Sequence, residues 1–230
     1  DVEPYGPNDS EYAASQRLLR RAVSALGPRF ADYLVADAEY ATSTFLHVTV
    51  EVGLPVIARL KNNLPDLAAK VKRRFNGKPP QQVVNEGGGR IEFWDEEDFP
   101  PWETLQWERV RVLRYRQHRA DGTVVEAEWL TNLSKRKVSS LSLFRMARSR
   151  WEIENEGFND CKSRQGLEHL CHHHTNSLLL CWLLTLLALV IGRLYRTRYL
   201  HRGRHSHVSA IDLVRRLWLN LALTPRCRSA

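Results

Sequence analysis

Paired cysteines and a signal-peptide pattern are both missing from this sequence. Its cysteines are scattered, and no two of them form a CxxC pair: Cys161, Cys171, Cys181 and Cys227. Small secreted proteins use paired cysteines as disulfide frameworks. The simplest interpretation is therefore a cytoplasmic protein with free thiols.

A recognisable zinc site is missing as well. The run "CHHHTN", which starts at Cys171, places three histidines next to one another. Adjacent residues cannot all face one ion on a helix, and no second cluster of ligands accompanies His172, His173 and His174. The sequence therefore gives little support to a metal role for these histidines.

The strongly apolar run near the end of the chain falls short of a membrane span. Its uncharged part, Ser177–Gly192, is shorter than the roughly 20 residues that a bilayer requires. We therefore predict a buried core helix over "NSLLLCWLLTLLALVIGRLY" and no membrane partner. Internal repeats and long disordered linkers are also missing.

Positive charge is what the sequence has in excess. A formal net charge of +8 and a pI near 9.6 make a polyanion the first partner to consider. Arginine outnumbers lysine, and its planar fork suits bidentate contact with phosphate oxygens. A genome rich in GC also favours arginine codons. The sequence therefore leaves two explanations of the arginine excess open, phosphate binding and codon usage.

Helices and strands alternate in the first 75 residues. Apolar periodicity and capping signals predict helices over residues 10–26, 41–53 and 64–75. Short apolar runs predict buried strands in "DYLVAD", which ends at Asp37, and in "LPVIARLK". This order implies a parallel sheet covered by helices, and therefore an α/β fold.

Residues 79–135 differ in composition from what precedes them. The segments "GGG", "FPPW" and "ADGT" separate the β-rich runs "RIEFW", "RVRVLRYR" and "VVEAEWLTNL". We predict an antiparallel β insertion. The arginines of the second run change parity between Arg111 and Arg114, and a bulge near Val112-Leu113 would return them to one face.

The helical period returns near Ser139 and predicts one helix to about Arg164. The tail from Arg193 to Arg228 holds nine arginines against one acid, Asp212, and one more amphipathic helix, "VSAIDLVRRLWLNLAL". The predicted domains are a partial core over residues 1–78, the β insertion over 79–135, two helices over 136–200 and a basic tail over 201–230.

Two acids occupy positions that suit chemistry. Asp37 follows a central strand at its carboxyl end, where α/β sheets usually bind ligands; the alternative is a helix N-cap. In "RWEIENEGFNDCK", Glu154 lies four residues after Arg150 and shares its face, whereas Glu156 is about 200° away. Lys162 flanks the same surface two turns later. The alternative for this cluster is a surface ion pair.

Two separated segments together resemble a known family. "YLVADAEYATSTFLHVTVEVGLPVIARLKNNLP", followed much later by "RMARSRWEIENEGFNDCKSRQGLEH", resembles the bacterial insertion-sequence DDE transposases. Most similar is the branch with a β-strand insertion, and "FWDEEDF" and "EWLTNL" resemble its strands. The resemblance implies a partial RNase H-like catalytic core with an inserted antiparallel β subdomain and C-terminal helices.

The resemblance also implies roles for individual residues. Asp37, in a "D-x-x-Y" pattern after a buried strand, matches the second catalytic aspartate, and Glu154, in "RW-x-IE", matches the catalytic glutamate. Both would be metal ligands, and we expect them within about 4 to 8 Å of each other. The candidates for DNA contact are Arg148, Arg150, Trp151 and Lys162.

Family membership would imply cut-and-paste DNA transposition. In this chemistry three carboxylates hold two Mg²⁺ or Mn²⁺ ions for in-line displacement at phosphorus. The partners would be double-stranded DNA, as terminal inverted repeats and target, and a second copy of the chain in a synaptic homodimer. The protein would be located in the bacterial cytoplasm, associated with the nucleoid.

Other residues of the two segments keep two interpretations. The tryptophans of the insertion, Trp94, Trp102 and Trp107, would either stack on a distorted transposon end or pack within the sheet. Glu152 and Glu156 are expected to face solvent or to orient the DNA end. Asp160, on the same predicted helix, is expected to face solvent only.

Three departures from the family pattern limit the expectation of activity. Ala147 stands where compact relatives have a tyrosine, and Lys162 follows the glutamate one residue late. No strand for the first catalytic aspartate precedes the first helix, and Asp1 and Glu3 lie at the wrong place. We therefore expect a C-terminal part of a transposase, inactive by itself. The alternatives are an RNase H-like nuclease without strand transfer and a catalytically inactive remnant that binds DNA.

Overall fold

The computed structural model describes residues 2–61, 63–86, 89–159, 161–162, 174–195, 198–199 and 210–223. The chain divides into two compact units, and each is described by itself. The first unit spans Glu3–Glu152 and the second spans Ile153–Ala230.

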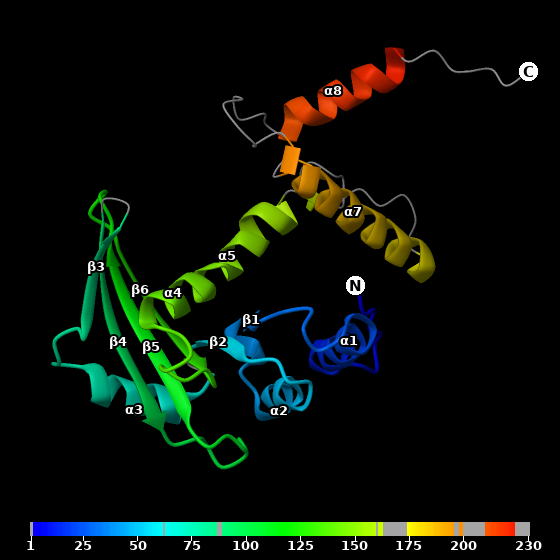
Figure 1. Cartoon of the computed structure of the whole chain (residues 1–230). Helices are drawn as coiled ribbons and strands as arrows, with labels where there is room; N and C mark the ends of the chain where they lie inside the picture. Colours follow the sequence, from blue (N-terminus) through cyan, green and yellow to red (C-terminus); the bar gives the residue numbers. More distant parts are fainter. Residues whose placement is uncertain are drawn as a thin grey trace, which may run out of the picture. The chain divides into compact units, whose positions relative to one another are not determined.

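A mixed six-stranded sheet organises the first unit, in the order β1-β2-β6-β5-β4-β3 (Figure 1). β1 and β2 are parallel, and every other neighbouring pair is antiparallel. The strands of the predicted insertion are therefore antiparallel, as expected, and they continue the sheet begun by β1 and β2. The strands are β1 (Leu34–Ala36), β2 (Val56–Leu60), β3 (Gln82–Glu86), β4 (Gly89–Phe99), β5 (Val110–His118) and β6 (Val124–Thr131).

The three helices predicted in the first 75 residues are confirmed, with their ends shifted by no more than about two residues. Local signals explain the agreement. For α1, the Ser10 hydroxyl accepts from the Ala13 amide, and Gly27, with φ of 85°, ends the helix. The helices of this unit are α1 (Glu11–Leu26), η1 (Ala38–Tyr40), α2 (Ser43–Glu51), α3 (Pro65–Phe75), α4 (Ser140–Arg148) and α5 (Arg150–Glu152).

The sheet is covered on both faces, because its strands alternate between two cores. In β2, Val56 and Ala58 belong to a core that includes Phe45 of α2 and Phe75 of α3. Ile57 belongs instead to the opposite core, which includes Leu143, Phe144 and Ala147 of α4. Central strands buried on both faces account for the near-continuous apolar runs in the sequence.

The bulge predicted near Val112-Leu113 is wrong. These two residues pair in regular register with Glu96 and Asp95 of β4. The register shift between these strands lies in β4 itself, between Glu96 and Phe99.

The parity change of the β5 arginines has another cause, because both faces of β5 are buried. Arg111 is 1% exposed and Arg114 is 6% exposed, and they point to opposite faces. Each has its own acid, since Arg111 pairs with Asp95 and Arg114 pairs with Glu128. Arg114 also lies over the Phe75 ring of α3, at 5.2 Å.

The tryptophans of the insertion pack within the protein, which agrees with the second of the two interpretations given for them. Trp94 and Trp107 are buried in the core beneath α3, and Trp102 packs against the same core. The Trp94 indole donates to the Lys78 carbonyl at 2.9 Å, and the Trp102 indole donates to the Ser43 hydroxyl at 2.7 Å.

The second unit corrects the prediction of one regular helix from Ser139 to Arg164. After α5 the backbone continues as the π-helix η2 (Ile153–Phe158). A π-helix closes i→i+5 hydrogen bonds, so the angles of about 100° per residue used for Glu156 do not apply there. Asp160, His172 and His173 lie outside the described residues.

Two further helices are described in the second unit, α7 (Thr175–Tyr195) and α8 (Ala210–Leu223). The predicted final amphipathic helix corresponds to α8. The prediction of a buried core helix is not confirmed for α7, since none of its described residues is buried. By length and composition α7 could cross a membrane. Core helices and signal sequences meet the same criteria, so this alone does not make the chain a membrane protein.

Candidate active site

Asp37 lies where the sequence places it, directly after β1. Its carboxylate accepts the Ala38 amide at 2.7 Å and caps η1. The two interpretations of Asp37 are therefore compatible: the side chain caps a short helix and also stands at the carboxyl end of a strand. Its side chain is 38% exposed, so a ligand can reach it.

A cleft of about 220 Å³ opens beside Asp37, between the sheet and the end of α4. Beside the cleft, Phe144 packs α4 against the sheet through edge contacts with Phe93 and Tyr115. From the strands and their ends it is lined by Asp37, Arg59, Lys61, Tyr115, Gln117, Arg119, Val125 and Trp129. From the helices it is lined by Ala147, Arg148, Arg150 and Trp151.

Cations dominate the lining of the cleft. Asp37 is the single acid among the described residues that line it, and Lys61 Nζ lies 3.8 Å from Oδ1 while Arg150 Nη1 lies 4.0 Å from Oδ2. Partial burial acts to raise the pKa of the Asp37 carboxyl. The Ala38 hydrogen bond and the charges of Arg150, Lys61 and Arg59 act the other way, and the net pKa is below the usual value. Asp37 is therefore an anion at neutral pH.

We predict that Arg150→Gln raises the pKa of Asp37, because it removes a positive charge beside the carboxylate. A carboxyl with a depressed pKa adds stability above its unfolded-state pKa, and this stability is lost as the pH falls through the folded-state value. NMR titration of the Asp37 carboxyl carbon measures the shift. Arg148→Gln is the matched control, since Arg148 is not among the groups that perturb Asp37. An unchanged Asp37 titration in Arg150→Gln would contradict the geometry.

Buried N–H groups without an acceptor among the described residues lie in the cleft, and two of them are Arg59 Nε and Trp129 Nε1. The two residues are neighbours across β2 and β6, and the Arg59 guanidinium lies 5.2 Å from the centre of the Trp129 ring. Buried donors without an acceptor are costly, so an oxyanion in the cleft would find donors ready for it.

The structure brings together four of the residues singled out in the sequence: Asp37, Arg148, Arg150 and Trp151. Glu154 and Lys162 belong to the second unit, where both are exposed. The approach of Asp37 to Glu154 within about 4 to 8 Å therefore stays a prediction. Ala147, at the position of the family tyrosine, is fully buried in the wall of the cleft.

Sequence reasoning missed the cations of the strands. Arg59 is the last residue but one of β2 and Lys61 directly follows this strand, beside the end of β1. Because carboxyl ends of neighbouring parallel strands meet at one edge, the segment "ARLK" was a signal that could have placed both near Asp37. Arg119 directly follows β5 and Trp129 lies in β6, and the sequence does not give the register of these strands.

Within the described residues, no group of three or more His, Cys, Asp and Glu side chains comes together as a metal site. Glu3 forms ion pairs with Arg17 and Arg21 of α1. Glu39 is exposed in η1, and Asp1 lies outside the described part of the chain.

A strand-end carboxylate in a cationic cleft beneath a helix is an arrangement suited to proteins that act on a phosphate backbone. A comparison with protein-family models matches the transposase DDE domain over residues 1–191. The chain belongs to this family. A search of curated proteins gives no match at the level required. Membership implies a transposase that acts on DNA, in a family that normally uses divalent metal ions and is typically cytosolic.

Proposed function

We propose that this chain supplies catalytic residues for metal-dependent DNA cleavage and strand transfer at transposon ends, by a cut-and-paste route and within an RNase H-like core. The observation that carries the proposal is Asp37 at the end of β1, faced by Arg150 across a cationic cleft. In a family of DNA-processing enzymes, such a carboxylate is the natural ligand for a hard cation beside a phosphate.

Asp37 and Glu154 are the proposed ligands. Bound Mg²⁺ or Mn²⁺ would supply stabilisation of negative charge at the reacting phosphorus. Two observations support these residues. Asp37 is held in its anionic form by its neighbours, which is the form that binds a cation. Glu154 is exposed within η2, and π-turns within helices are frequent at functional sites.

The cations of the cleft are the proposed contacts to the DNA backbone. Arg148 and Arg150 come from the helices, and Arg59 and Lys61 come from the end of β2. Arginine forks bind phosphate in a bidentate manner, and the unpartnered Arg59 and Trp129 donors would also be satisfied by phosphate oxygens. Trp151 is 53% exposed at the same cleft and can stack on an unpaired base. Lys162, from the second unit, is a further proposed backbone contact.

We predict that DNA binding weakens steeply with salt and that the cleft contributes to the slope. Each neutralised phosphate adds about 0.9 to the slope of log affinity against log salt. Arg148→Gln should therefore flatten the slope by about one. The matched control is Arg109→Gln, since Arg109 lies outside this cleft and pairs with Glu108. Affinity that is constant between about 50 and 200 mM salt would contradict the proposal.

Strand-transfer assays on paired oligonucleotides with the element's own terminal repeats separate the alternatives. The chain is assayed alone and together with any upstream part of its reading frame, in Mg²⁺ and in Mn²⁺. Joined products in a complex of two chains and two ends support the transposase. Cleavage without joining would favour the RNase H-like nuclease, and tight binding without cleavage would favour the inactive remnant.

A further inference from the structure

Two opposite charges are buried on the α4 face of the sheet, at the end away from the cleft. Asp95 of β4 and Arg111 of β5 are each 1% exposed. The Arg111 guanidinium binds the carboxylate in a bidentate manner, with Nε donating to Oδ1 at 2.9 Å and Nη2 donating to Oδ2 at 2.5 Å. Because desolvation offsets much of the attraction in such a pair, net stability alone is a weak reason for it.

The pair holds the loop that connects β6 to α4. Arg111 Nη1 donates to two loop carbonyls, that of Leu133 at 3.2 Å and that of Val138 at 2.8 Å. The Ser140 hydroxyl donates to Asp95 Oδ2 at 2.6 Å. Ser140 is the first residue of α4, so the buried charges reach the start of the helix directly.

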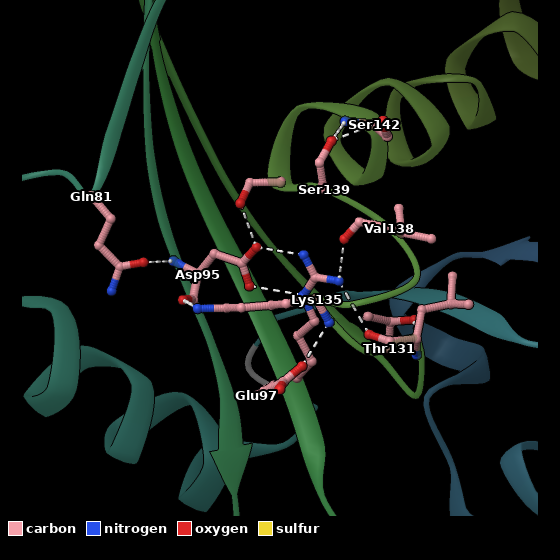
Figure 2. A network of polar contacts seen from close by, with 11 residues as sticks. Gln81, Asp95, Glu97, Thr131, Lys135, Val138, Ser139 and Ser142 are labelled. Carbon is pink, nitrogen blue, oxygen red and sulfur yellow. Dashed lines mark hydrogen bonds and ion pairs between the residues drawn. The ribbon is translucent and has the colours of Figure 1, made fainter.

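Further contacts tie the same loop to β4. The Lys135 amide donates to Glu97 at 2.6 Å, and the Lys135 ammonium donates to the Asp95 carbonyl (Figure 2). On the other side of Asp95, its amide donates to Gln81 at 3.1 Å. The beginning of α4 is therefore held by directed contacts to two strands.

After Ser140, the buried contacts of α4 with the sheet are apolar and come from Leu143, Phe144 and Ala147, and apolar packing is non-directional. Two polar contacts, Arg145 with Glu86 at 3.1 Å and Arg148 with Gln117 at 3.4 Å, are exposed and therefore hold the helix only weakly. From Ser140 to Arg150 the helical chain rises about 15 Å. A change of about 5° in helix direction would thus move Arg150 by about 1.3 Å, relative to a contact of 4.0 Å with Asp37.

We infer that the Asp95–Arg111 pair is a positioning device, which fixes the start of α4 on the sheet and so aims Arg148 and Arg150 into the cleft. The functional consequence rests on the proposed role of these two arginines in binding DNA. Asp95 and Arg111 are not among the residues that line the cleft, and they are not proposed to contact DNA. They act through the helix.

The direct test measures the width of the cleft in the folded protein. Nitroxide labels are introduced with a non-canonical amino acid at positions 61 and 151, which line opposite sides of the cleft and are both exposed. Pulsed EPR is then recorded for the parent, Arg111→Lys and Ser140→Ala, with folding checked by circular dichroism. Lysine keeps the charge of Arg111 but loses the fork and the two loop contacts.

We expect a broader or shifted distance distribution in Arg111→Lys, a smaller change in Ser140→Ala, and the parent distribution in Ser140→Thr, which keeps the hydroxyl. Ser142→Ala is the matched control, because Ser142 lies on the same turn without contacting Asp95. Parent-like distributions in both Arg111→Lys and Ser140→Ala, with lowered melting temperatures, would overturn the inference and leave the pair a stabilising element only.

A second arm separates this inference from the proposed function. Affinity for a terminal-repeat duplex is measured for the same variants without labels, where a misplacement near 1 Å is expected to weaken binding on the order of tenfold. Changed distances with lowered affinity support both ideas. Changed distances with unchanged affinity uphold the positioning device and overturn the DNA-binding role of the cleft.

Discussion

Replacing Asp37 with asparagine is expected to lower metal-dependent DNA cleavage and strand transfer below about one thousandth of the parent rate. Asparagine has the same shape and keeps the oxygen that accepts the Ala38 amide. It removes the negative charge that would hold a divalent cation. A loss of about 4 kcal/mol of transition-state stabilisation corresponds to this factor. DNA affinity should persist, since the substitution leaves every cation of the cleft in place.

The matched control is Asp32→Asn. Asp32 is exposed and lies before β1, at the end opposite to Asp37, so its loss should leave the rate near that of the parent. Glu154→Gln should be as inactive as Asp37→Asn. Full activity of Asp37→Asn would contradict the assignment of Asp37 as a metal ligand. Activity that survives in Glu154→Gln but not in Asp37→Asn would point to Glu156 as the ligand instead of Glu154.

Replacing Asp95 with alanine is expected to lower the free energy of unfolding by about 3 to 5 kcal/mol. The substitution leaves the Arg111 guanidinium buried without its counter-charge, in a site that is 1% exposed. It also removes the acceptor of the Ser140 hydroxyl at the start of α4. Urea denaturation at neutral pH, followed by circular dichroism, measures the change.

Two variants delimit this prediction. Glu51→Ala breaks an exposed ion pair with Arg20 and should leave stability near that of the parent. The double replacement Asp95→Leu with Arg111→Met removes both charges and should recover most of the loss, because neither charge is then left alone. A stability for Asp95→Ala equal to that for Glu51→Ala would show that the buried pair contributes little.

The parts of the fold that the sequence predicts are those with local signals. Asp37 could be placed because a short apolar strand directly precedes it, α1 starts at a Ser10 cap and α3 starts with a proline. The β-rich runs predicted β4, β5 and β6. The strand β3 was missed, because it lies at the edge of the sheet and most of its residues are exposed, so it has no apolar run.

The parts that were missed depend on contacts between distant segments. Asp95 lies in the run "FWDEEDF", which the resemblance assigned to a strand, but only the pairing of β4 with β5 brings it to Arg111. The same holds for the cleft, whose cations come from β2, β5 and the helices. The π-helix at Glu154 could not be anticipated either, because periodicity in the sequence assumes regular α-helical turns.

The central claim is that Asp37 and Glu154 hold the same metal ion, and cleavage of the polypeptide by bound iron tests it most directly. Fe²⁺ replaces Mg²⁺, and ascorbate with hydrogen peroxide then generates hydroxyl radicals that cut the backbone beside the ion. We predict cuts next to both Asp37 and Glu154, suppressed by excess Mg²⁺ and lost together in Asp37→Asn. Cuts beside only one of the two residues, or cuts near Glu154 that persist in Asp37→Asn, would contradict a shared site.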